Sequence, residues 1–397
     1  MIEVREHFDL SQMTTFGLPA KCGRLVICQG EDLPELDREG ILNDAIILGG
    51  GSNMLFLHDL PSRTVIHLDD QSIQALPFSA LSASLASPAP RSASPLPSSD
   101  FPKGTEPEDC STVLVRVATG MPLDNLCRYT CDHNLWGMEN LSGIPGCVGG
   151  AAVQNVGAYG AEFKDVVKGV HCYSLRRHSY ITIPVEQCAY GYRDSIFKHL
   201  SADDRLIVTE VTIAVSHTSK PNLSYKGLAE ALGLQATSGN GTPVSNPASP
   251  SGKPLCSYDI RKAVIALRDS KLPDPAKTGS AGSFFKNPVV SPEEFHRIAA
   301  LAPEGKTLTC HTTPDGGCKL SAAWLIDNAG CKSLTCGGAA LWQKQPLVIV
   351  NATGKATGAD VLALEKAVID RVREKFGVTL SPEVVHIPSH QFSSHQS

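Results

Sequence analysis

The chain has 397 residues, of which 42% are hydrophobic and 19% are charged, and this composition is ordinary for a soluble globular protein of two or three domains. Its 35 Lys and Arg against 40 Asp and Glu give a net charge of −5, which excludes an overall positive field that would draw the protein to nucleic acid or anionic lipid. The N-terminus has no basic region followed by an apolar run, and no later stretch stays apolar for long enough to span a bilayer, so we expect a cytoplasmic protein without a membrane partner.

The 13 cysteines are odd in number and follow no repeating frame. In a chain of this length, that pattern favours reduced thiols over a disulfide scaffold. The densest group is Cys310, Cys318, Cys331 and Cys336, and it contains no Cys-x-x-Cys pair. We therefore expect no metal site.

Two short apolar runs near the N-terminus, residues 25–28 and 45–48, flank a polar segment that is long enough to carry a helix. This order predicts a β-α-β unit. The second run ends in Gly49, Gly50, Gly51, Ser52 and Asn53. Glycine amides after a buried strand suit a pyrophosphate, and the two polar side chains add donors, although a tight exit from the strand explains the segment equally well.

The middle of the chain contains two low-complexity insertions, at residues 75–110 and 235–254. The first is dominated by Ser, Ala and Pro and is expected to be disordered. Between and beyond them, the patterns predict strands at 113–118, 180–183 and 206–215 and helices at 123–131 and 260–268. Residues 271–275 hold two prolines, which suit a stiff crossing between domains.

The C-terminal part carries clear signals for where its helices begin and end. Ser291, Pro292 and Glu294 form a capping box with proline at the first helical position. A second helix is expected to begin after Thr357 and to end at Gly377. The last ordered piece is predicted at residues 380–387, followed by a mobile tail.

The most unusual stretch runs over residues 142–150 and continues over residues 154–160. So many glycines around one proline, with hardly a charge, predict backbone that passes close to a ligand while its amides stay able to donate. A large, flat, anionic ligand fits this description. If the stretch stood alone, a glycine-rich turn between strands would be the plain alternative.

Six motifs occur together in one order. They are Thr15 to Gly17, Gly49 to Asn53, Ser142 to Gly160, Gly191 to Lys198, Gly282 to Pro288 and Pro382 to Val384. In this order they resemble the motifs of the UDP-N-acetylenolpyruvoylglucosamine reductase family, flavoenzymes of peptidoglycan precursor synthesis. The resemblance extends over nearly the whole chain outside the two insertions.

The resemblance implies an α/β (α+β) fold. An FAD-binding part of two subdomains, similar to the vanillyl-alcohol-oxidase type, is expected to precede a smaller substrate-binding domain. The implied limits are 1–68 and 69–271 for the subdomains, 272–377 for the substrate-binding domain and 378–397 for a segment that returns to the active site and ends in the tail.

The resemblance also implies a reaction. NADPH would reduce the enolpyruvyl ether of UDP-N-acetylglucosamine to the lactyl ether of UDP-N-acetylmuramate, with FAD carrying the hydride. The glycine-rich segments and the lack of an evident histidine or cysteine attachment motif predict that this FAD is bound noncovalently. NADPH would leave before the substrate enters. The expected partner is thus a UDP-sugar, with no nucleic acid or membrane, and we expect a monomer.

Site residues follow from the resemblance position by position. The expected cofactor-binding residues are Gly49, Gly50, Gly51, Ser52, Asn53, Pro145, Gly146, Gly149, Gly150, Asn155 and Gly157. The expected substrate-binding residues are Tyr225, Lys271, Asn287 and Gln345. Tyr225 lies in a stretch that resembles the tyrosine-bearing loop of one branch of the family, which closes over the substrate. A packed tyrosine, a solvated lysine and a turn asparagine are the alternatives.

Two positions depart from the family pattern. Thr14 stands where the family usually has asparagine, and Trp342 stands where histidine is expected. Neither position is expected to touch the chemistry. The second departure weakens the assignment of Gln345.

Three residues fit the chemistry that the resemblance implies. Hydride addition to an enol ether places negative charge on the neighbouring carbon and carboxylate, so the site needs a cation or hydrogen-bond donors and a proton donor. Arg193 offers a planar fork for the carboxylate, Ser283 a hydroxyl beside a dry pocket and Glu383 a carboxyl that partial burial would keep protonated. A structural ion pair, an ordinary serine and a strand-edge carboxylate are the alternatives.

Two other functions remain open from the sequence. One is an FAD-dependent oxidase of the same flavin fold that acts on an alcohol or sugar, which rapid reoxidation of the flavin by oxygen would reveal. The other is a nucleotide-sugar-binding regulatory protein, which would bind no flavin.

Overall fold

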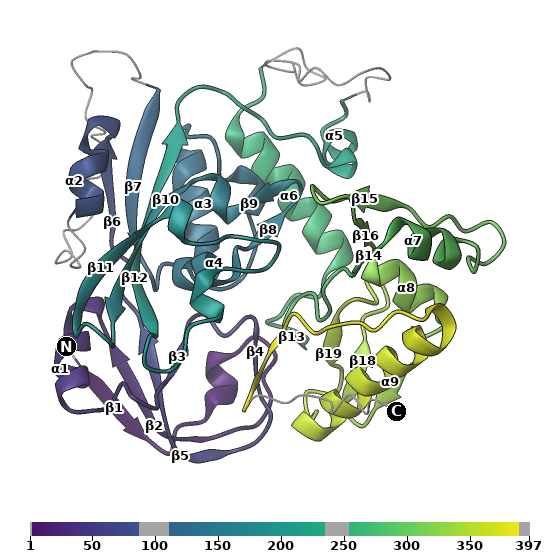
Figure 1. Cartoon of the computed structure of the whole chain (residues 1–397), viewed down its shortest axis with the longest axis horizontal. Coiled ribbons are helices and arrows are strands. Elements are labelled where there is room, and N and C mark those ends of the chain that lie inside the picture. The colour runs from purple at the N-terminus through teal and green to yellow at the C-terminus, as the bar shows by residue number, and fades with distance from the viewer. Residues whose placement is uncertain (1, 87–110, 235–253, 389–397) are drawn as a thin grey trace. The chain divides into compact units, whose positions relative to one another are not determined.

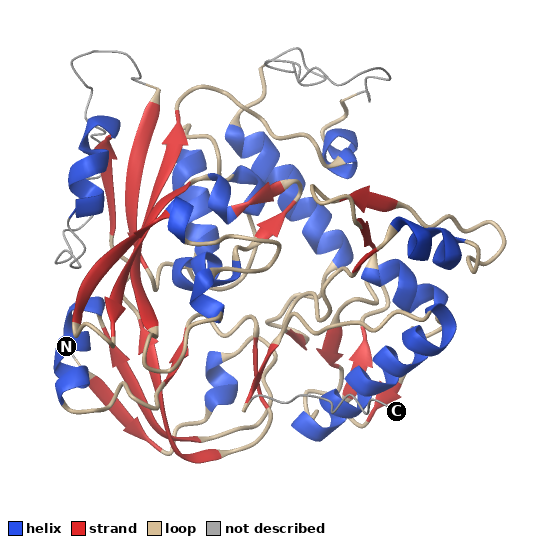
Figure 2. Ribbon diagram, viewed as in Figure 1, coloured by secondary structure: helices blue, strands red, loops and turns tan. Residues whose placement is uncertain are grey.

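The computed structural model describes residues 2–86, 111–234 and 254–388 (Figure 1). By internal contacts the chain divides into a first unit, Met1–Glu6, Arg24–Gly50 and Ser62–Ser270, and a second unit, His7–Gly23, Gly51–Pro61 and Lys271–Ser397. Both units mix helices and strands (Figure 2), so the prediction of a mixed α/β fold is confirmed. The domain limits expected at residues 68, 271 and 377 stay predictions.

The first unit contains a small sheet with the strand order β1-β2-β5-β3. Its strands are β1 (Glu3–Glu6), β2 (Cys22–Cys28), β5 (Leu60–Leu68) and β3 (Ile46–Leu48). Helix α1 (Leu33–Arg38) joins β2 to β3, which confirms the predicted β-α-β order. The two strands of this β-α-β segment are not neighbours in the sheet, however. β5 lies between β2 and β3 and pairs in parallel with β3.

The larger sheet of the first unit is antiparallel, with the order β11-β10-β12-β7-β6. Its strands are β6 (Ile73–Pro77), β7 (Thr112–Ala118), β10 (Val167–Ser174), β11 (Ser179–Pro184) and β12 (Leu206–Ser216). These bounds confirm the strands predicted at 113–118, 180–183 and 206–215. The shorter elements of this unit are β8 (Gly157–Ala158), β9 (Ala161–Glu162) and helix α5 (Lys226–Ala231).

Helices α3 (Leu123–Asp132) and α4 (Val148–Gln154) pack against one face of the larger sheet. Val115 and Val117 of β7 share a buried cluster with Leu126 of α3 and Val148 of α4. Helix α6 (Ser257–Lys271) confirms the helix predicted at 260–268 and extends it at both ends. The sheet thus supports α3, α4 and the segment between them, in which the glycine-rich stretch begins before it continues through α4.

The expectation of disorder from residue 75 onward is wrong for residues 75–86. Ala75 lies in β6 opposite Val115 of β7, and helix α2 (Leu81–Ala86) follows. A strand edge on β7 supplies hydrogen-bond partners that composition does not reveal. The remainder of the first insertion, residues 235–253 of the second and the tail from residue 389 lie outside the described residues.

In its described residues, the second unit contains small sheets and three α-helices. Its sheets are β13-β19-β18-β17, β14-β16-β15 and the parallel pair β20-β4. The strands are β4 (Met54–Phe56), β13 (Gly279–Ser280), β14 (Val289–Val290), β15 (Cys310–Thr312), β16 (Cys318–Leu320), β17 (Thr335–Cys336), β18 (Ala339–Leu341), β19 (Ile349–Asn351) and β20 (Val385–Ile387). The helices are α7 (Pro292–Ala299), α8 (Ala322–Asn328) and α9 (Gly358–Phe376).

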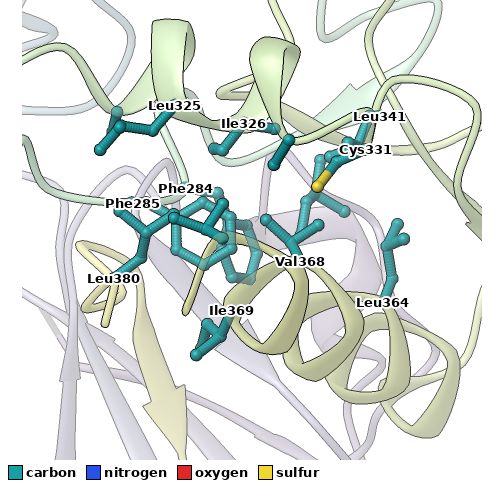
Figure 3. Packing of buried hydrophobic residues seen from close by; sticks show 14 of the residues in the cluster. Phe284, Phe285, Leu325, Ile326, Cys331, Leu341, Leu364, Val368, Ile369 and Leu380 are labelled. Atoms are coloured by element: carbon teal, nitrogen blue, oxygen red, sulfur yellow. The ribbon is translucent and has the colours of Figure 1, made fainter. Parts of the chain in front are cut away.

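The core of the second unit forms where α8 and α9 meet the segment around Phe284 and Phe285 (Figure 3). Leu364 and Val368 of α9 contribute to it, and both are fully buried. None of the helices in the described part of the chain is long and apolar enough to cross a membrane.

The predicted start of α7 and the predicted start and end of α9 are confirmed. Ser291 and Glu294 form the capping box of α7, and Thr357 and Asp360 form that of α9. Helix α9 ends at Gly377, which has a left-handed backbone with φ of 71°. These local signals come from neighbouring residues, so they can be read from the sequence without knowing the tertiary structure.

Replacing Thr357 by alanine should lower the free energy of unfolding by about 1 kcal/mol, because the first turn of α9 loses an N-cap acceptor. The Thr357 Oγ1 accepts from the Asp360 N–H at 3.2 Å. Urea unfolding measures this effect. Thr357→Ser keeps the hydroxyl and should stay close to the parent, and an equal loss in both variants would contradict the capping account.

Candidate functional site

The first unit brings the two glycine-rich segments into backbone contact. A Cβ added at Gly50 would lie 2.6 Å from the Cα of Gly146, and one added at Gly49 would lie 2.7 Å from the Sγ of Cys147. Neither position has room for a side chain, which is the physical reason for glycine at both. Among the residues that the structure describes, the N–H groups of Gly50 and Gly146 donate to no other group. They therefore remain able to donate to an anionic ligand.

The start of α4 is fixed against the end of β7. Gly149 N–H donates to the Thr119 carbonyl at 2.9 Å, and a Cβ on Gly149 would lie 1.8 Å from the Thr119 Oγ1. Cys147 is the N-cap residue, and its Sγ accepts from the Gly150 N–H at 3.5 Å. Pro145 lies exposed two residues earlier. Four of the expected cofactor-binding residues thus lie in one short segment of defined backbone.

The end of α4 holds three more of the expected site residues together. Asn155 is fully buried with a left-handed backbone, and its Nδ2 donates to the Gly191 carbonyl at 2.8 Å. The Arg193 guanidinium donates to the Gly157 carbonyl at 2.6 Å and to the Asn155 carbonyl at 3.5 Å. Asn155, Gly157 and Arg193 therefore form one hydrogen-bonded group.

Arg193 occupies a tight turn with strained backbone. Its φ is 54°, and Gly191 and Asp194 on either side exchange two backbone hydrogen bonds of 3.0 and 3.2 Å. Such a conformation costs a non-glycine residue about 1–3 kcal/mol, and strain of this kind clusters at functional sites. Lys198 Nζ donates to the Arg193 carbonyl at 2.9 Å, so a second cation lies beside the turn.

A clamp of charged side chains from α3 and α6 holds the peptide groups of Gly143. The Asp124 carboxylate accepts from the Gly143 N–H at 2.6 Å and from both terminal nitrogens of Arg261 at 2.5 and 2.8 Å. Arg268 Nε donates to the Gly143 carbonyl at 3.1 Å. Gly143 has a φ of 72°, and a Cβ there would lie 3.2 Å from the Arg268 side chain. The N–H of Gly143 is thus held by Asp124, which pairs with Arg261 of α6, and its carbonyl is held by Arg268 of α6.

The clamp lowers the pKa of the Asp124 carboxyl. Partial burial by itself would raise that pKa, but the hydrogen bonds from Arg261 and from the Gly143 N–H outweigh the effect of burial. A carboxyl with a depressed pKa adds stability above its unfolded-state pKa of about 3.9, and this stability is lost as the pH falls through the lower folded-state pKa. Unfolding at acid pH therefore reports on the clamp.

Replacing Arg261 by methionine should lower the free energy of unfolding by about 1 kcal/mol at neutral pH. This free-energy loss is at the low end of the range for a hydrogen bond to a charged group. The Asp124 side chain is 38% exposed, so water screens its interaction with Arg261. Urea unfolding of Arg261→Met and of the parent measures the effect, first at pH 7 and then at a series of pH values from about 3.9 downward through the lower folded-state pKa of Asp124.

The difference between the two proteins should shrink in acid, where Asp124 becomes protonated in both. Arg176→Met serves as the control, because it removes an ion pair with Asp204 in which the arginine is 73% exposed. This substitution should change the free energy of unfolding little at neutral or acid pH. A difference for Arg261→Met that stays constant with pH would contradict the ion-pair account.

Tyr225 lies beside the end of the glycine-rich stretch. Its ring meets that of Tyr159 edge to face, with centroids 5.1 Å apart, and it is 38% exposed. Asn140 Nδ2 donates to the carbonyls of Tyr159 and Asn222 at 2.7 and 2.9 Å, which ties the Tyr225 segment to the stretch. Burial raises the pKa of the Tyr159 phenol. The Tyr159 phenol therefore stays uncharged at neutral pH.

In the second unit, Ser283 and Glu383 lie on adjoining backbone segments. Glu383 N–H donates to the carbonyl of Phe284 at 2.8 Å, directly after Ser283. Asn53 Nδ2 donates to the Glu383 carbonyl at 3.2 Å, and the Asn53 carbonyl accepts from Val385 N–H at 2.9 Å. Both Ser283 and Glu383 are half-buried. The structure thus brings together Asn53, Ser283 and Glu383, whereas Arg193 belongs to the first unit.

The segment of Gly51 and Ser52 is held against the Thr-Phe-Gly motif. A Cβ on Gly51 would lie 2.0 Å from the Met13 carbonyl oxygen, and the Gly51 carbonyl accepts from Thr15 N–H at 3.2 Å. Thr14 Oγ1 accepts from Gly17 N–H at 3.3 Å, so the threonine acts as a local turn acceptor at the position where asparagine was expected.

Asn287 caps helix α8. Its Oδ1 accepts from the Ala322 N–H at 2.9 Å. Among the described residues its Nδ2 has no protein acceptor. The side chain therefore keeps a donor group for a phosphate or sugar oxygen.

Trp342 joins two of the expected substrate-binding residues. Its Nε1 donates to the Lys271 carbonyl at 2.9 Å, and its own carbonyl accepts from the Gln345 N–H at 3.1 Å. The departure at this position thus supports the turn that carries Gln345.

Sequence reasoning missed the residues that hold the glycine-rich stretch from outside, namely Thr119, Asp124, Asn140 and Arg261. Each lies in an ordinary local context, and its partner is distant in sequence. Asp124 is an exception in part, since an acidic residue in the first turn of a predicted helix is a recognisable signal.

Comparison with known proteins adds three findings. Residues 274–387 match the family model described as the C-terminal domain of UDP-N-acetylenolpyruvoylglucosamine reductase, and residues 102–175 match an FAD binding domain. The proteins named UDP-N-acetylenolpyruvoylglucosamine reductase from Porphyromonas gingivalis strain W83 and Chromobacterium violaceum are 34% and 36% identical to this chain, over 97% and 96% of it and 100% and 98% of their own lengths.

Among solved structures, the chain is similar to a UDP-N-acetylenolpyruvylglucosamine reductase from Thermus caldophilus, with a TM-score of 0.58 and 22% identity over 97% of this chain and 98% of that one. At that identity the likeness supports the fold alone.

Proposed function

Because the chain belongs to the UDP-N-acetylenolpyruvoylglucosamine reductase family, we propose that it uses NADPH, through noncovalently bound FAD, to reduce UDP-N-acetylglucosamine enolpyruvate to UDP-N-acetylmuramate. It is an FAD-containing oxidoreductase of that family, and its partner is a UDP-sugar. A cytoplasmic location, a monomeric state and the domain limits given above are parts of the proposal.

The backbone contact between Gly50 and Gly146 is the observation that carries this proposal furthest. It leaves two N–H groups without a protein acceptor in the described part of the chain, at positions where no side chain fits. A dinucleotide with a pyrophosphate fits such a cradle, since closely approaching backbone and unused amides are what its oxygens require. Bound FAD would accept hydride from NADPH and deliver it to the substrate.

The protein's own residues would manage charge and the proton. Ser283 would donate the proton that completes the reduction. Arg193 and Glu383 would stabilise the negative charge that develops at the substrate carboxylate. Tyr225, Lys271, Asn287 and Gln345 would hold the nucleotide and diphosphate, with the unused Nδ2 of Asn287 as one donor.

The visible absorption spectrum of the purified protein tests this function. We expect a flavin spectrum, release of the chromophore into the supernatant by acid or heat, and bleaching by NADPH without oxygen. Adding the enolpyruvyl substrate should restore the colour. Colourless protein that FAD cannot reconstitute would refute the assignment, and rapid bleaching by an alcohol or sugar would favour an oxidase.

A further inference from the structure

A pair of ionisable side chains, neither of them assigned a role above, lies in the interior of the second unit. His386 of β20 and Glu365 of α9 approach with Nε2 and Oε2 3.0 Å apart, and their side chains are 4% and 0% exposed. In the described part of the chain, neither carboxylate oxygen of Glu365 accepts a hydrogen bond. The His386 Nε2 is therefore the polar atom that faces the buried Glu365 carboxyl.

Such a pair is a poor way to stabilise a core. Removing two charges from water is costly, and their attraction offsets that cost only when further hydrogen bonds satisfy the remaining atoms. Apolar side chains lie nearby: the Phe284 ring is 6.2 Å from the His386 ring, measured between centroids. Leu364, the residue before Glu365 in the sequence, belongs to the buried core that Figure 3 draws. Apolar side chains of similar size at these two positions would stabilise the fold equally well or better.

The pair lies beside the strand β20, whose pairing with β4 sets the register of the C-terminal segment. β20 and β4 form a two-stranded parallel pair of three residues each, in which His386 lies opposite Leu55. So short a ladder has few backbone hydrogen bonds of its own to fix its register, and the bonds made by Ser381 and Glu383 act only on the residues before it. A slip by one residue would turn His386 away from α9 and leave the buried Glu365 unpaired. The pair therefore penalises every register except the observed one.

Three residues before His386, the same segment carries Glu383. Its N–H bonds the Phe284 carbonyl, next to Ser283, and the Ser381 carbonyl accepts from Lys286 N–H at 2.9 Å. A change of register in β20 would move Glu383 relative to Ser283. A displacement of about 1 Å at reacting groups can cost a factor of about 10² in rate.

We propose that Glu365 and His386 are positioning residues, which fix the register of the C-terminal segment and through it the placement of Glu383 beside Ser283. The pair acts through the backbone and does not touch the substrate. The link to catalysis rests on the function proposed above, whereas the link to register does not.

The decisive variant is the double substitution Glu365→Leu with His386→Phe. It replaces the pair by apolar groups of similar size, so the protein should melt at the parent's temperature or above it. Hydrogen exchange of residues 381–388 should nevertheless become faster. Flavin reduction by NADPH should stay within about twofold of the parent, and reoxidation by the enolpyruvyl substrate should slow by about 10- to 100-fold.

A matched control is available on the same helix. Lys366 pairs with Asp370 on the exposed side of α9, and Lys366→Leu should change neither hydrogen exchange of the segment nor either half-reaction. If the double variant melts early, Glu365→Gln takes its place, because it removes the charge and keeps the shape.

The outcomes are separable. Parent-like hydrogen exchange and parent-like reoxidation in a stable variant would overturn the proposal, since the pair would then serve packing alone. Faster exchange with unchanged reoxidation would confine the pair to register and remove it from catalysis. If the parent itself shows neither half-reaction, the proposed function fails, while hydrogen exchange still decides the register.

Discussion

Replacing Ser283 by alanine should leave the reduction of flavin by NADPH nearly normal and slow its reoxidation by the enolpyruvyl substrate by about 10²–10⁴-fold. The first half-reaction involves no substrate proton, so removing a hydroxyl does not affect it. The second needs a proton at the carbon next to the one that receives hydride. The expected loss corresponds to about 3–5 kcal/mol of barrier. Stopped-flow absorbance under anaerobic conditions follows both half-reactions separately.

Glu383 provides the comparison for this experiment. Glu383→Gln keeps a hydrogen-bond donor of similar shape, so it should slow reoxidation less than Glu383→Ala does. The backbone bond from Glu383 N–H to the Phe284 carbonyl survives in both variants, which keeps the local structure comparable. Unchanged reoxidation in Ser283→Ala would remove Ser283 from the mechanism.

Much of the fold can be predicted because its signals are local. The capping boxes at Ser291 and Thr357 and the glycine at 377 lie within a turn of the helices they delimit. The sequence does not reveal which strands pair with each other. β5 enters the small sheet between β2 and β3, and β6 forms in a segment that composition marks as disordered, because in each case the partner strand supplies the hydrogen bonds.

The candidate site divides along the same line. Resemblance gives positions such as Arg193 and Asn155, but it does not show that Asn155 holds the turn of Arg193 through the Gly191 carbonyl. The clamp on Gly143 joins residues 137 positions apart, Asp124 and Arg261. Trp342 departs from the family pattern, which has histidine at this position. In the structure its Nε1 donates a hydrogen bond to the Lys271 carbonyl, a contact that the pattern does not predict.

Replacing Gly50 by alanine should weaken FAD binding by at least about 100-fold, which is about 2.7 kcal/mol. The added methyl group would lie 2.6 Å from Gly146 Cα and 3.0 Å from its carbonyl carbon. Both are backbone atoms, so no side-chain rotation relieves the clash and the two glycine-rich segments must separate. Their unused amides then no longer face a common ligand. Titration of the apoprotein with FAD, followed by flavin fluorescence, measures the affinity.

The neighbouring glycine supplies a matched control. A methyl group at Gly49 would meet the Cys147 Sγ at 2.7 Å, and among the described residues beyond its two chain neighbours no other heavy atom lies within 4 Å of it. Gly49→Ala should therefore weaken FAD binding too, but Cys147→Ala should rescue it, because the clashing atom is then gone. The same substitution should not rescue Gly50→Ala, whose clash is with backbone. Rescue of both variants, or of neither, would show that steric contact between the two segments does not govern the affinity.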